Sequence, residues 1–186
     1  MVGSLSTFFD AAIQLKYVDR AGWKAKAGVK HPESVADHAY SMCAIGMAMS
    51  DAMGLDTERV LKMIVLHDLG ESIVGDYMPG QVSAKRKQAE EDSAIKKIIS
   101  GLPAKVRTEY SRIWREYGQG RTKEARLVRR VDKFEMALQA ARYAKDGRPR
   151  KMLAQFFETA HAAVGVDDDA MTKILKSLSP APRRKK

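Results

Sequence analysis

The sequence predicts an all-α protein built as a single helical-bundle domain. Apolar residues recur at i, i+3, i+4 and i+7 along most of the chain, which is the period of amphipathic helices. No segment shows the two-residue alternation of a half-buried strand, and no Asn-Gly hairpin turn interrupts the helical pattern. A chain of 186 residues, of which 45% are hydrophobic, suits one domain with a substantial core. We expect one domain over 1–180 and a basic tail over 181–186.

The helices of the N-terminal half are bounded by recognisable start and stop residues. We expect a first helix over 4–17, followed by a polar loop with the sequence DRAGWKAKAGVKHPE. The next helix covers 34–53, because Ser34 and Asp37 form a capping-box-like pair at its start. The segment GLD separates it from a helix over about 57–69, which ends near the next glycine.

The C-terminal half continues the same pattern. After the loop GDYMPGQV, Ser83 can cap a helix over 84–100, which the segment SGLP closes. Turn residues separate four further predicted helices, which cover 103–117, 121–145, 150–163 and 168–178. We interpret Trp114 and Tyr117, in the first of these, as packing residues.

The net charge of +10 raises the question of a nucleic-acid partner. Four of these charges come from the last four residues, and the others are spread along helices in mixed-sign runs such as AKRKQAEEDSAIKK. Such runs are typical of a solvated helix face, so we do not expect specific nucleic-acid binding. A basic surface also suits a small anionic substrate such as a phosphate ester.

Cysteine usage and the apolar segments indicate the cytoplasm. Cys43 is the single cysteine, which excludes an internal disulfide framework and fits a reducing compartment. The first residues, MVGSLSTFFDAAIQLK, lack a basic stretch ahead of an apolar core, so they do not form a signal-peptide pattern. No window is apolar enough to span a membrane.

Polar residues interrupt the apolar faces of three predicted helices. His38 shares a face with Met42, and the apolar stripes of VLKMIVLHDLGESIVGD run directly into His67 and Asp68. Asp132 lies on the apolar face of a third helix. Buried carboxylates are costly unless they are paired or bind a metal ion, so these positions require an explanation.

Each residue has an ordinary structural explanation as well as a functional one. A buried histidine is often a hydrogen-bonded core residue, and Asp132 has two arginines close by in sequence. Together, however, two histidines and two aspartates from three helices supply N and O ligands without a thiolate, which suits Mn²⁺, Co²⁺, Fe²⁺, Ni²⁺ or Zn²⁺. The adjacent His67 and Asp68 reach one ion only if their helix ends or distorts there, which Gly70 favours.

Three segments in order resemble the HD-domain metal-dependent phosphohydrolases. HPESVADHAYSM, VLHDLGESIVGDYMP and VDKFEMALQA are similar to segments of the 5′-deoxynucleotidase group, which includes HD domain-containing protein 2. The resemblance covers about residues 5–160 with compatible spacing. It implies an HD domain with one divalent ion (Mn²⁺, Co²⁺, Zn²⁺, Fe²⁺, Ni²⁺ or Mg²⁺), a homodimer, and removal of phosphate from (deoxy)nucleoside 5′-monophosphates.

The resemblance also implies roles for individual residues. Glu71 and Asp76 match acidic residues beside the metal, and Arg20 matches a basic residue that orients the substrate phosphate. In bacterial members a tryptophan follows this arginine directly, whereas here two residues intervene before Trp23, so strict preference for deoxyribose is not implied. The implied metal ligands are His38, His67, Asp68 and Asp132.

These residues suit the hydrolysis of a phosphate monoester. We hypothesise that a water activated by the ion attacks phosphorus in line, while Arg20 and the ion hold the phosphoryl oxygens. Glu71 is the candidate for proton transfer, to the leaving 5′-oxygen or from the attacking water, and its alternative role is to anchor a ligand histidine. Asp76 is a candidate for binding the sugar or for proton transfer, and Tyr77 for lining the nucleoside side.

Two other functions stay open at this point. One is an HD phosphodiesterase acting on a cyclic or signalling nucleotide, although such enzymes often hold two metals and only His31 and His161 are left as further histidines. The other is a catalytically silent basic module that binds nucleic acid, for which binding should depend strongly on salt.

Overall fold

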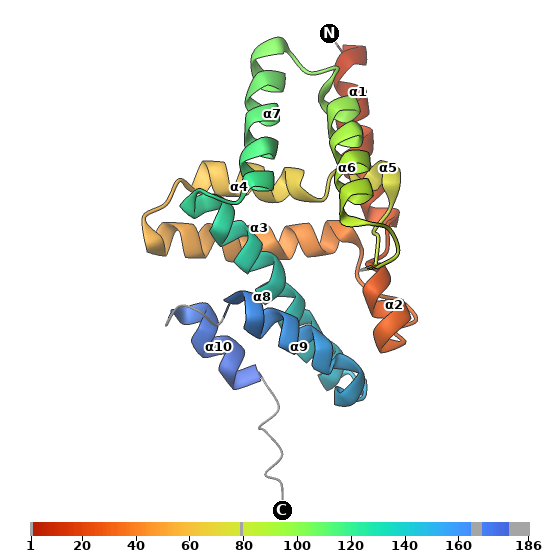
Figure 1. The fold of residues 1–186 in the computed structure, drawn as a ribbon, viewed down its shortest axis with the longest axis vertical. Coiled ribbons are helices and arrows are strands. Elements are labelled where there is room, and N and C mark those ends of the chain that lie inside the picture. The colour runs from red at the N-terminus through yellow and green to blue at the C-terminus, as the bar shows by residue number, and fades with distance from the viewer. Residues whose placement is uncertain (1, 79, 165–168, 179–186) are drawn as a thin grey trace, which may run out of the picture.

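The computed structural model describes residues 2–78, 80–164 and 169–178, and within them the fold is all-α. A single isolated bridge between Asp19 and Ser34 is the β-type pairing in this part of the chain. The expected basic tail over 181–186 lies outside the described residues. The helices in chain order (Figure 1) are α1 (Val2–Gln14), the 3₁₀-helix η1 (Leu15–Tyr17), α2 (Ala21–Ala27), α3 (Val35–Met53), α4 (Thr57–His67), α5 (Glu71–Val74), α6 (Ala84–Ile99), α7 (Ala104–Gln119), α8 (Lys123–Lys145), α9 (Arg150–Val164) and α10 (Ala170–Leu178).

All the predicted helices are present, and their ends shift by less than one turn. The prediction of a continuous polar loop after the first helix was wrong, because that segment contains α2. Its Trp23 and Ala27 are buried, and Gly28 ends the helix with a φ of 64°, a conformation that favours glycine. The short α5, directly after the His-Asp doublet, was also not predicted.

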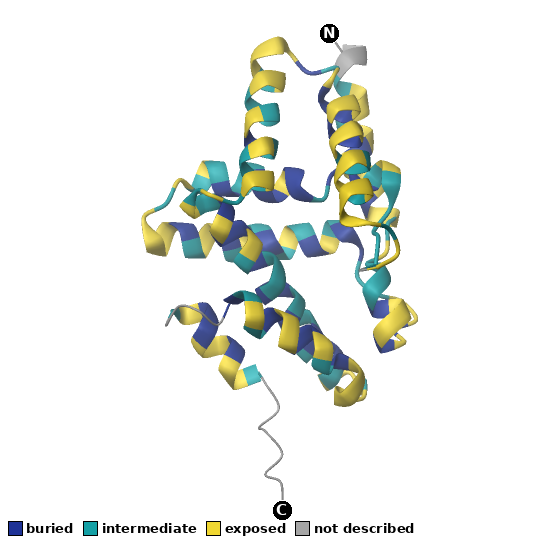
Figure 2. Ribbon diagram, viewed as in Figure 1, coloured by how far each residue is buried: buried dark blue, intermediate teal, exposed yellow. Residues whose placement is uncertain are grey.

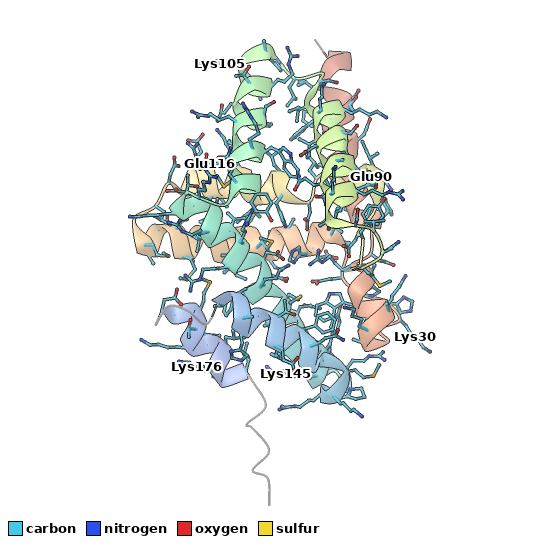
Figure 3. All side chains as sticks on the ribbon, in the orientation of Figure 1. Lys30, Glu90, Lys105, Glu116, Lys145 and Lys176 are labelled. Carbon is cyan, nitrogen blue, oxygen red and sulfur yellow. The ribbon has the colours of Figure 1, made fainter. Side chains whose placement is uncertain are left out.

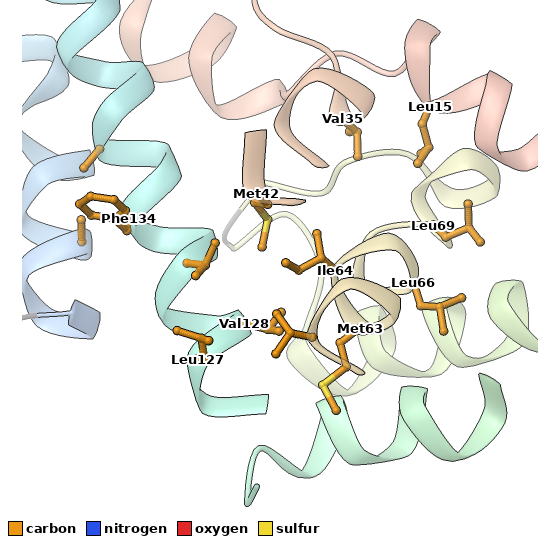
Figure 4. Packing of buried hydrophobic residues seen from close by; sticks show 14 of the residues in the cluster. Leu15, Val35, Met42, Met63, Ile64, Leu66, Leu69, Leu127, Val128 and Phe134 are labelled. Carbon is orange, nitrogen blue, oxygen red and sulfur yellow. The ribbon is translucent and has the colours of Figure 1, made fainter. Parts of the chain in front are cut away.

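The core is centred on α3, α4 and α8. The first two lie side by side across the middle of the molecule, and α8 packs against both (Figure 1). Met42, Ile64 and Val128, one from each helix, are completely buried and belong to one hydrophobic cluster (Figure 4). Gly46 permits the close approach of α3 and α4, because a Cβ atom there would lie 2.4 Å from Cδ1 of Ile64.

The ends of α3 and α4 place the residues of interest. Ser34 and Asp37 form the predicted capping box, so His38 falls in the first turns of α3. Helix α4 ends at His67, two residues earlier than predicted, and Asp68 is its C-cap with φ −112° and ψ 6°. The helix therefore ends between the two members of the doublet, as binding of both to one ion requires.

The remaining helices surround this layer. Helices α6 and α7 extend upward from it in Figure 1, with α1 packed against α6, while α9 packs along α8. The sides of α6 and α7 that face away from the core are largely exposed (Figure 2), and Ile113 is the buried residue of α7. In the described part of the chain, no helix is long and apolar enough to cross a membrane.

Charged side chains are distributed over the whole molecule. Lys30, in the loop after α2, and Lys105, Lys145 and Lys176, on α7, α8 and α10, are all exposed (Figure 3). Several basic side chains are paired with acidic ones, for example in the ion pair that joins Arg59 of α4 to Glu116 of α7.

Candidate metal centre

His38 is held by a carboxylate on a neighbouring helix. Its Nδ1 lies 2.5 Å from Oε2 of Glu135 on α8, and the imidazole is completely buried. Its Nε2 lies 3.5 Å from Oδ1 of Asp132, and this atom has no hydrogen-bond partner among the described residues. Histidine ligands of metals are commonly oriented in this way, with one ring nitrogen bound to a carboxylate and the other left for the ion.

His67 is fixed by its own helix. Nδ1 lies 2.6 Å from the carbonyl oxygen of Ile64, which can only accept, so Nδ1 carries the hydrogen and Nε2 is the free donor atom toward a metal. Nε2 lies 3.0 Å from Oδ2 of Asp68, but this approach is not a hydrogen bond, and Nε2 is buried without a partner in the described part of the molecule. Both histidines therefore present an unpaired nitrogen.

Two ionised carboxylates complete the group. Burial raises the pKa of Asp68, but the neighbouring His67 and Arg20 outweigh this effect and hold that pKa well below its usual range. Asp132 has a lowered pKa as well, because His38 and Lys133, whose Nζ lies 2.8 Å from Oδ2, outweigh its burial. Both groups are negatively charged at neutral pH.

The negative charge acts in turn on His38. Burial and Arg20 favour the neutral ring, but Asp132 and Glu135 outweigh them and raise the pKa of His38 to about 9. The surroundings of Nε2 therefore attract a cation, and a proton and a metal ion compete for that atom.

The donor atoms fit one divalent ion. Ligand atoms of His38, His67 and Asp132 all lie within 4.8 Å of one another. Oδ2 of Asp68 lies 3.0 Å from Nε2 of His67 and 3.9 Å from Nε2 of His38. The two histidine nitrogens and the Asp132 oxygen at such separations can surround an ion at usual coordination distances, and Asp68 lies beside both histidines. The structure thus brings together the four residues that the sequence predicted as ligands.

Glu71, the first residue of α5, is buried beside this group. It is 2% exposed, and its Oε2 has no hydrogen-bond partner among the described residues. Nζ of Lys87 on α6 lies 3.8 Å from Oε1. Burial and the nearby charges of Asp68 and Asp76 raise the pKa of Glu71 to about 10, so this carboxyl group keeps its proton at neutral pH.

The other predicted site residues lie around the same space. Oδ2 of Asp76 accepts a hydrogen bond of 2.8 Å from the backbone N–H of Ala21, which ties the loop after α5 to the start of α2. The hydroxyl of Tyr77 donates to Glu90 of α6 at 2.5 Å. Nη1 of Arg20 lies 3.4 Å from Oδ2 of Asp68.

Trp23 is anchored more firmly than the sequence indicated. Its Nε1–H donates to Glu33 at 2.8 Å, and its ring stacks on Phe156 at 4.1 Å and meets Tyr143 edge-on at 5.1 Å. It is 2% exposed, so it contributes only a small part of its surface to the cavity that it lines.

A cavity of about 430 Å³ opens next to the donor atoms. This volume lies in the range of small-molecule sites. Residues from α2, α4, α5, α6, α7, α8 and α9 and from the segments between them line it, and among them are Arg20, His67, Asp68, Glu71 and Asp132. Three of the candidate ligands, His67, Asp68 and Asp132, therefore face the same space as Arg20 and Glu71.

Some residues of the site were not found from the sequence. Glu135 lies three positions after Asp132 on the same helix, so their shared face was a usable signal. Lys87 lies in a mixed-charge run that looks like a solvated face. Trp114 and Tyr117 pack against the core as predicted, but both also line the cavity, and the ring of Tyr117 meets the imidazole of His67 edge-on at 5.9 Å.

The similarity to known proteins extends over most of the chain. The family model described as HD domain matches residues 12–172, a range that contains all four candidate metal ligands. The chain belongs to the HD domain family. The HD domain accounts for the all-α fold, and this membership confirms the resemblance that the sequence segments indicated.

Relatives of this HD-domain protein are named as nucleotidases. It is 40% identical over 146 residues to 5′-deoxynucleotidase HDDC2 from Dictyostelium discoideum, covering 74% of this chain and 76% of the relative. It is 35% identical over 157 residues to 5′-deoxynucleotidase HDDC2 from Homo sapiens, covering 84% and 76%. Among solved structures, the PH0347 protein from Pyrococcus horikoshii OT3 matches with a TM-score of 0.77 and 30% identity, over 96% of this chain and 98% of that chain.

Proposed function

We propose that this HD-domain protein is a metal-dependent phosphohydrolase that releases phosphate from deoxynucleoside and nucleoside 5′-monophosphates. The observation that carries the proposal is the pair of buried, unpaired imidazole nitrogens of His38 and His67, which converge with two carboxylates beside a cavity. The relatives named 5′-deoxynucleotidase support the substrate class.

A single divalent ion is the cofactor in this proposal. Mn²⁺, Co²⁺, Zn²⁺, Fe²⁺, Ni²⁺ and Mg²⁺ are the candidates, and the proposed ligands are His38, His67, Asp68 and Asp132. When bound, such an ion supplies a Lewis acid that lowers the pKa of a coordinated water and compensates charge on the phosphoryl oxygens.

Arg20 is proposed to bind the substrate phosphate. Its backbone N–H donates to the carbonyl oxygen of Glu33 at 3.1 Å, which fixes the residue at the start of α2. A guanidinium group has five N–H donors, and the contact with Asp68 uses one of them. The others can hold phosphoryl oxygens in the cavity that Arg20 lines, where a charge-assisted pair is strong.

Glu71 is proposed to transfer the proton. The new bond joins the water oxygen to phosphorus, the bond from phosphorus to the 5′-oxygen breaks, and the leaving oxygen requires a proton. Because burial keeps Glu71 protonated, its carboxyl group can donate that proton to the leaving 5′-oxygen, and it can then recover the proton that the former water oxygen carries on the phosphate product. A carboxylate restricted to anchoring a ligand histidine would lack this role, and its substitution would weaken metal binding instead.

The sugar is proposed to lie near the loop after α5. Asp76 and Tyr77 line the cavity there, together with the exposed edge of Trp23. The carboxylate of Asp76 accepts one hydrogen bond from Ala21, and its remaining acceptor sites can receive a sugar hydroxyl. Since Trp23 is largely buried, we do not propose strict exclusion of ribose.

The deciding experiment measures phosphate release by chelator-treated protein with a panel of nucleoside 5′- and 3′-monophosphates. Each is assayed alone and with Mn²⁺, Co²⁺, Mg²⁺, Zn²⁺, Fe²⁺ or Ni²⁺ added. We expect turnover of 5′-monophosphates that depends on added metal. Absence of release with every metal, or equal release from 3′-monophosphates, would reject the proposed function.

A matched pair of histidine variants controls the metal assignment. His67→Ala should lose bound metal and activity together, whereas His31→Ala, which changes an exposed histidine in a loop, should keep both. Equal loss in the two variants would indicate a general effect on folding and would remove support for the proposed ligands.

Assembly and location complete the proposal. We propose a homodimer, supported by exposed apolar side chains such as Phe9, Ile13 and Tyr40, and sedimentation of the purified protein tests it. A cytoplasmic location agrees with nucleotide substrates and with a single cysteine. The proposed HD domain spans 1–180, followed by a basic tail over 181–186.

A further inference from the structure

The cavity wall formed by α6 and α7 contains a cluster that the proposed chemistry does not use. Oδ1 of Asp92 accepts a hydrogen bond of 2.7 Å from Nε1 of Trp114 and another of 3.0 Å from Nε2 of Gln88. Gln88 and Trp114 both line the cavity. One carboxylate thus orients two cavity-lining side chains that come from two different helices.

The chemistry of this cluster leaves specific groups for a ligand. An ionised carboxylate only accepts hydrogen bonds, so Gln88 must turn its NH₂ group to Asp92, and its carbonyl oxygen remains an acceptor. The indole of Trp114 is fixed through its N–H edge, and therefore its ring surface on the cavity side stays available for stacking. A fixed aromatic plane beside an amide acceptor suits a planar heterocycle that carries N–H donors.

The position of the cluster relative to the metal centre fits one part of a nucleotide. The ring of Tyr117 lies 5.9 Å from that of His67, and the ring of Trp114 lies 6.2 Å from that of Tyr117. Arg129 covers Tyr117 at 5.6 Å from its ring centre. One aromatic ring therefore separates Trp114 from His67, and all three residues line the same cavity, so a ligand with its phosphate at the candidate metal ligands can extend to Trp114.

The second tryptophan of the chain is less suited to stacking. Trp23 already stacks on Phe156, meets Tyr143 with its edge, and is 2% exposed. Trp114 is only partly buried and has a cavity-side surface. The two indoles thus differ in what they can offer to a ligand.

We propose that Trp114 and Gln88 form the nucleobase subsite of the cavity, and that Asp92 positions both. The inference rests on the proposed function, because the phosphate at the metal centre is what brings the base to this wall. Trp114 stacks on the base, and the carbonyl oxygen of Gln88 accepts a hydrogen bond from it.

The test compares a substrate with a base and one without. 2′-Deoxyadenosine 5′-monophosphate and 2-deoxyribose 5-phosphate share the phosphate and the sugar. For Trp114→Ala we expect kcat/KM to fall about 5- to 100-fold with the nucleotide, the range typical of lost base stacking, and to change less than about twofold with the sugar phosphate. Trp114→Phe should keep most of the wild-type kcat/KM with the nucleotide. Asp92→Ala should lower kcat/KM less than Trp114→Ala does, and only with the nucleotide.

Two controls separate this inference from the proposed function. Tyr17→Ala removes an exposed aromatic ring that does not line the cavity, and it should change kcat/KM with neither substrate. If Trp114→Ala lowers kcat/KM equally with both substrates, or with neither, the proposed base subsite is wrong while the phosphohydrolase proposal stands. If the wild-type protein hydrolyses no monophosphate, the proposed function is wrong, and the base subsite is decided by binding.

Binding is measured by tryptophan fluorescence of the metal-loaded protein. A non-hydrolysable 5′-phosphonate analogue of deoxyadenosine monophosphate should quench the emission of the wild type, because a stacked base quenches an indole. In Trp114→Phe, which keeps Trp23, the quenching should disappear. Unchanged quenching in that variant would overturn the inference.

Discussion

His67 and Trp114 face the same cavity but are held in opposite ways. His67 is 5% exposed and is fixed by a backbone carbonyl in a helix whose core side is completely buried. Trp114 lies on α7, in which Ile113 is the buried residue, and it is oriented by the exposed carboxylate of Asp92. The candidate metal centre is thus part of the hydrophobic core, whereas the wall of α6 and α7 is a surface feature.

This difference separates two properties of the site. The positions of the proposed metal ligands depend on the packing of α3, α4 and α8, so changes in that packing should affect both folding and metal binding. Side chains on the α6–α7 wall can change without moving the ligands. We therefore expect the chemistry to be sensitive to the core, and substrate preference to be sensitive to the wall.

The largest effect is expected for Asp132→Ala. Loss of this carboxylate removes a candidate ligand and leaves Lys133 without its partner, so metal binding should fail and kcat/KM should fall by about 10³-fold or more. Metal content by mass spectrometry and phosphate release measure the two losses. If the metal-free variant still released phosphate, the proposal that the reaction takes place at these core residues would be wrong.

Glu71→Gln should separate catalysis from metal binding. We expect kcat to fall by about 10²-fold, because the amide cannot transfer the proton, while metal content stays unchanged. The substitution should also change how the free energy of unfolding depends on pH. The pKa of Glu71 is raised above its unfolded value of 4.5 to about 10, so the wild type loses stability as pH rises between these values.

Thermal unfolding of the metal-stripped proteins checks this second effect. As the pH rises from about 5 to about 9, the melting temperature of Glu71→Gln should rise relative to that of the wild type. The reason is that the wild type must lose the Glu71 proton in this range, whereas the variant has no such proton to lose. An unchanged kcat would leave Glu71 a purely structural residue. Loss of metal would favour the anchoring role instead.

Glu135→Ala tests how the core orients His38. Without the carboxylate at Nδ1 the imidazole can rotate, so metal affinity should fall about 10- to 100-fold. Titration with Co²⁺ or Zn²⁺ measures it. Glu135→Gln, which keeps a hydrogen-bonding oxygen, should recover part of the affinity, and equal affinity in all three proteins would contradict the positioning role.

Gly46→Val tests the close approach of α3 and α4. The added side chain would meet Ile64, and the free energy of unfolding should fall by about 1–3 kcal/mol. Gly118→Ala is the matched control on α7, because a Cβ atom there has no neighbour within 4 Å. Denaturant unfolding of both variants gives the comparison, and equal stability would show that the helix contact tolerates a larger residue.

The smallest effect is expected for Gln88→Ala on the wall. Its side chain is exposed, so the free energy of unfolding should change by less than about 0.5 kcal/mol. Metal affinity should stay within about twofold of the wild type, a threshold close to that energy. A larger loss of metal affinity would mean that the wall and the core are coupled, and it would remove the distinction drawn between them.

The sequence by itself determined the helices and the candidate ligands. Helical periodicity and local caps such as Ser34 with Asp37 depend on neighbours three or four residues away, and these can be read directly from the chain. His38, His67 and Asp132 stood out because a polar residue on an apolar face is a local anomaly. The short α2 was not predicted, because the apolar pattern of seven residues is too short to distinguish a helix from a loop.

The tertiary structure alone decided which side chains meet. The pair of His38 and Glu135 spans 97 positions, and the contact between Asp92 and Trp114 spans 22 positions across two helices. No local pattern contains such a distance, because it depends on how whole helices pack. For the same reason the two tryptophans look alike in the sequence, and only packing makes Trp23 a buried anchor and leaves Trp114 at the cavity.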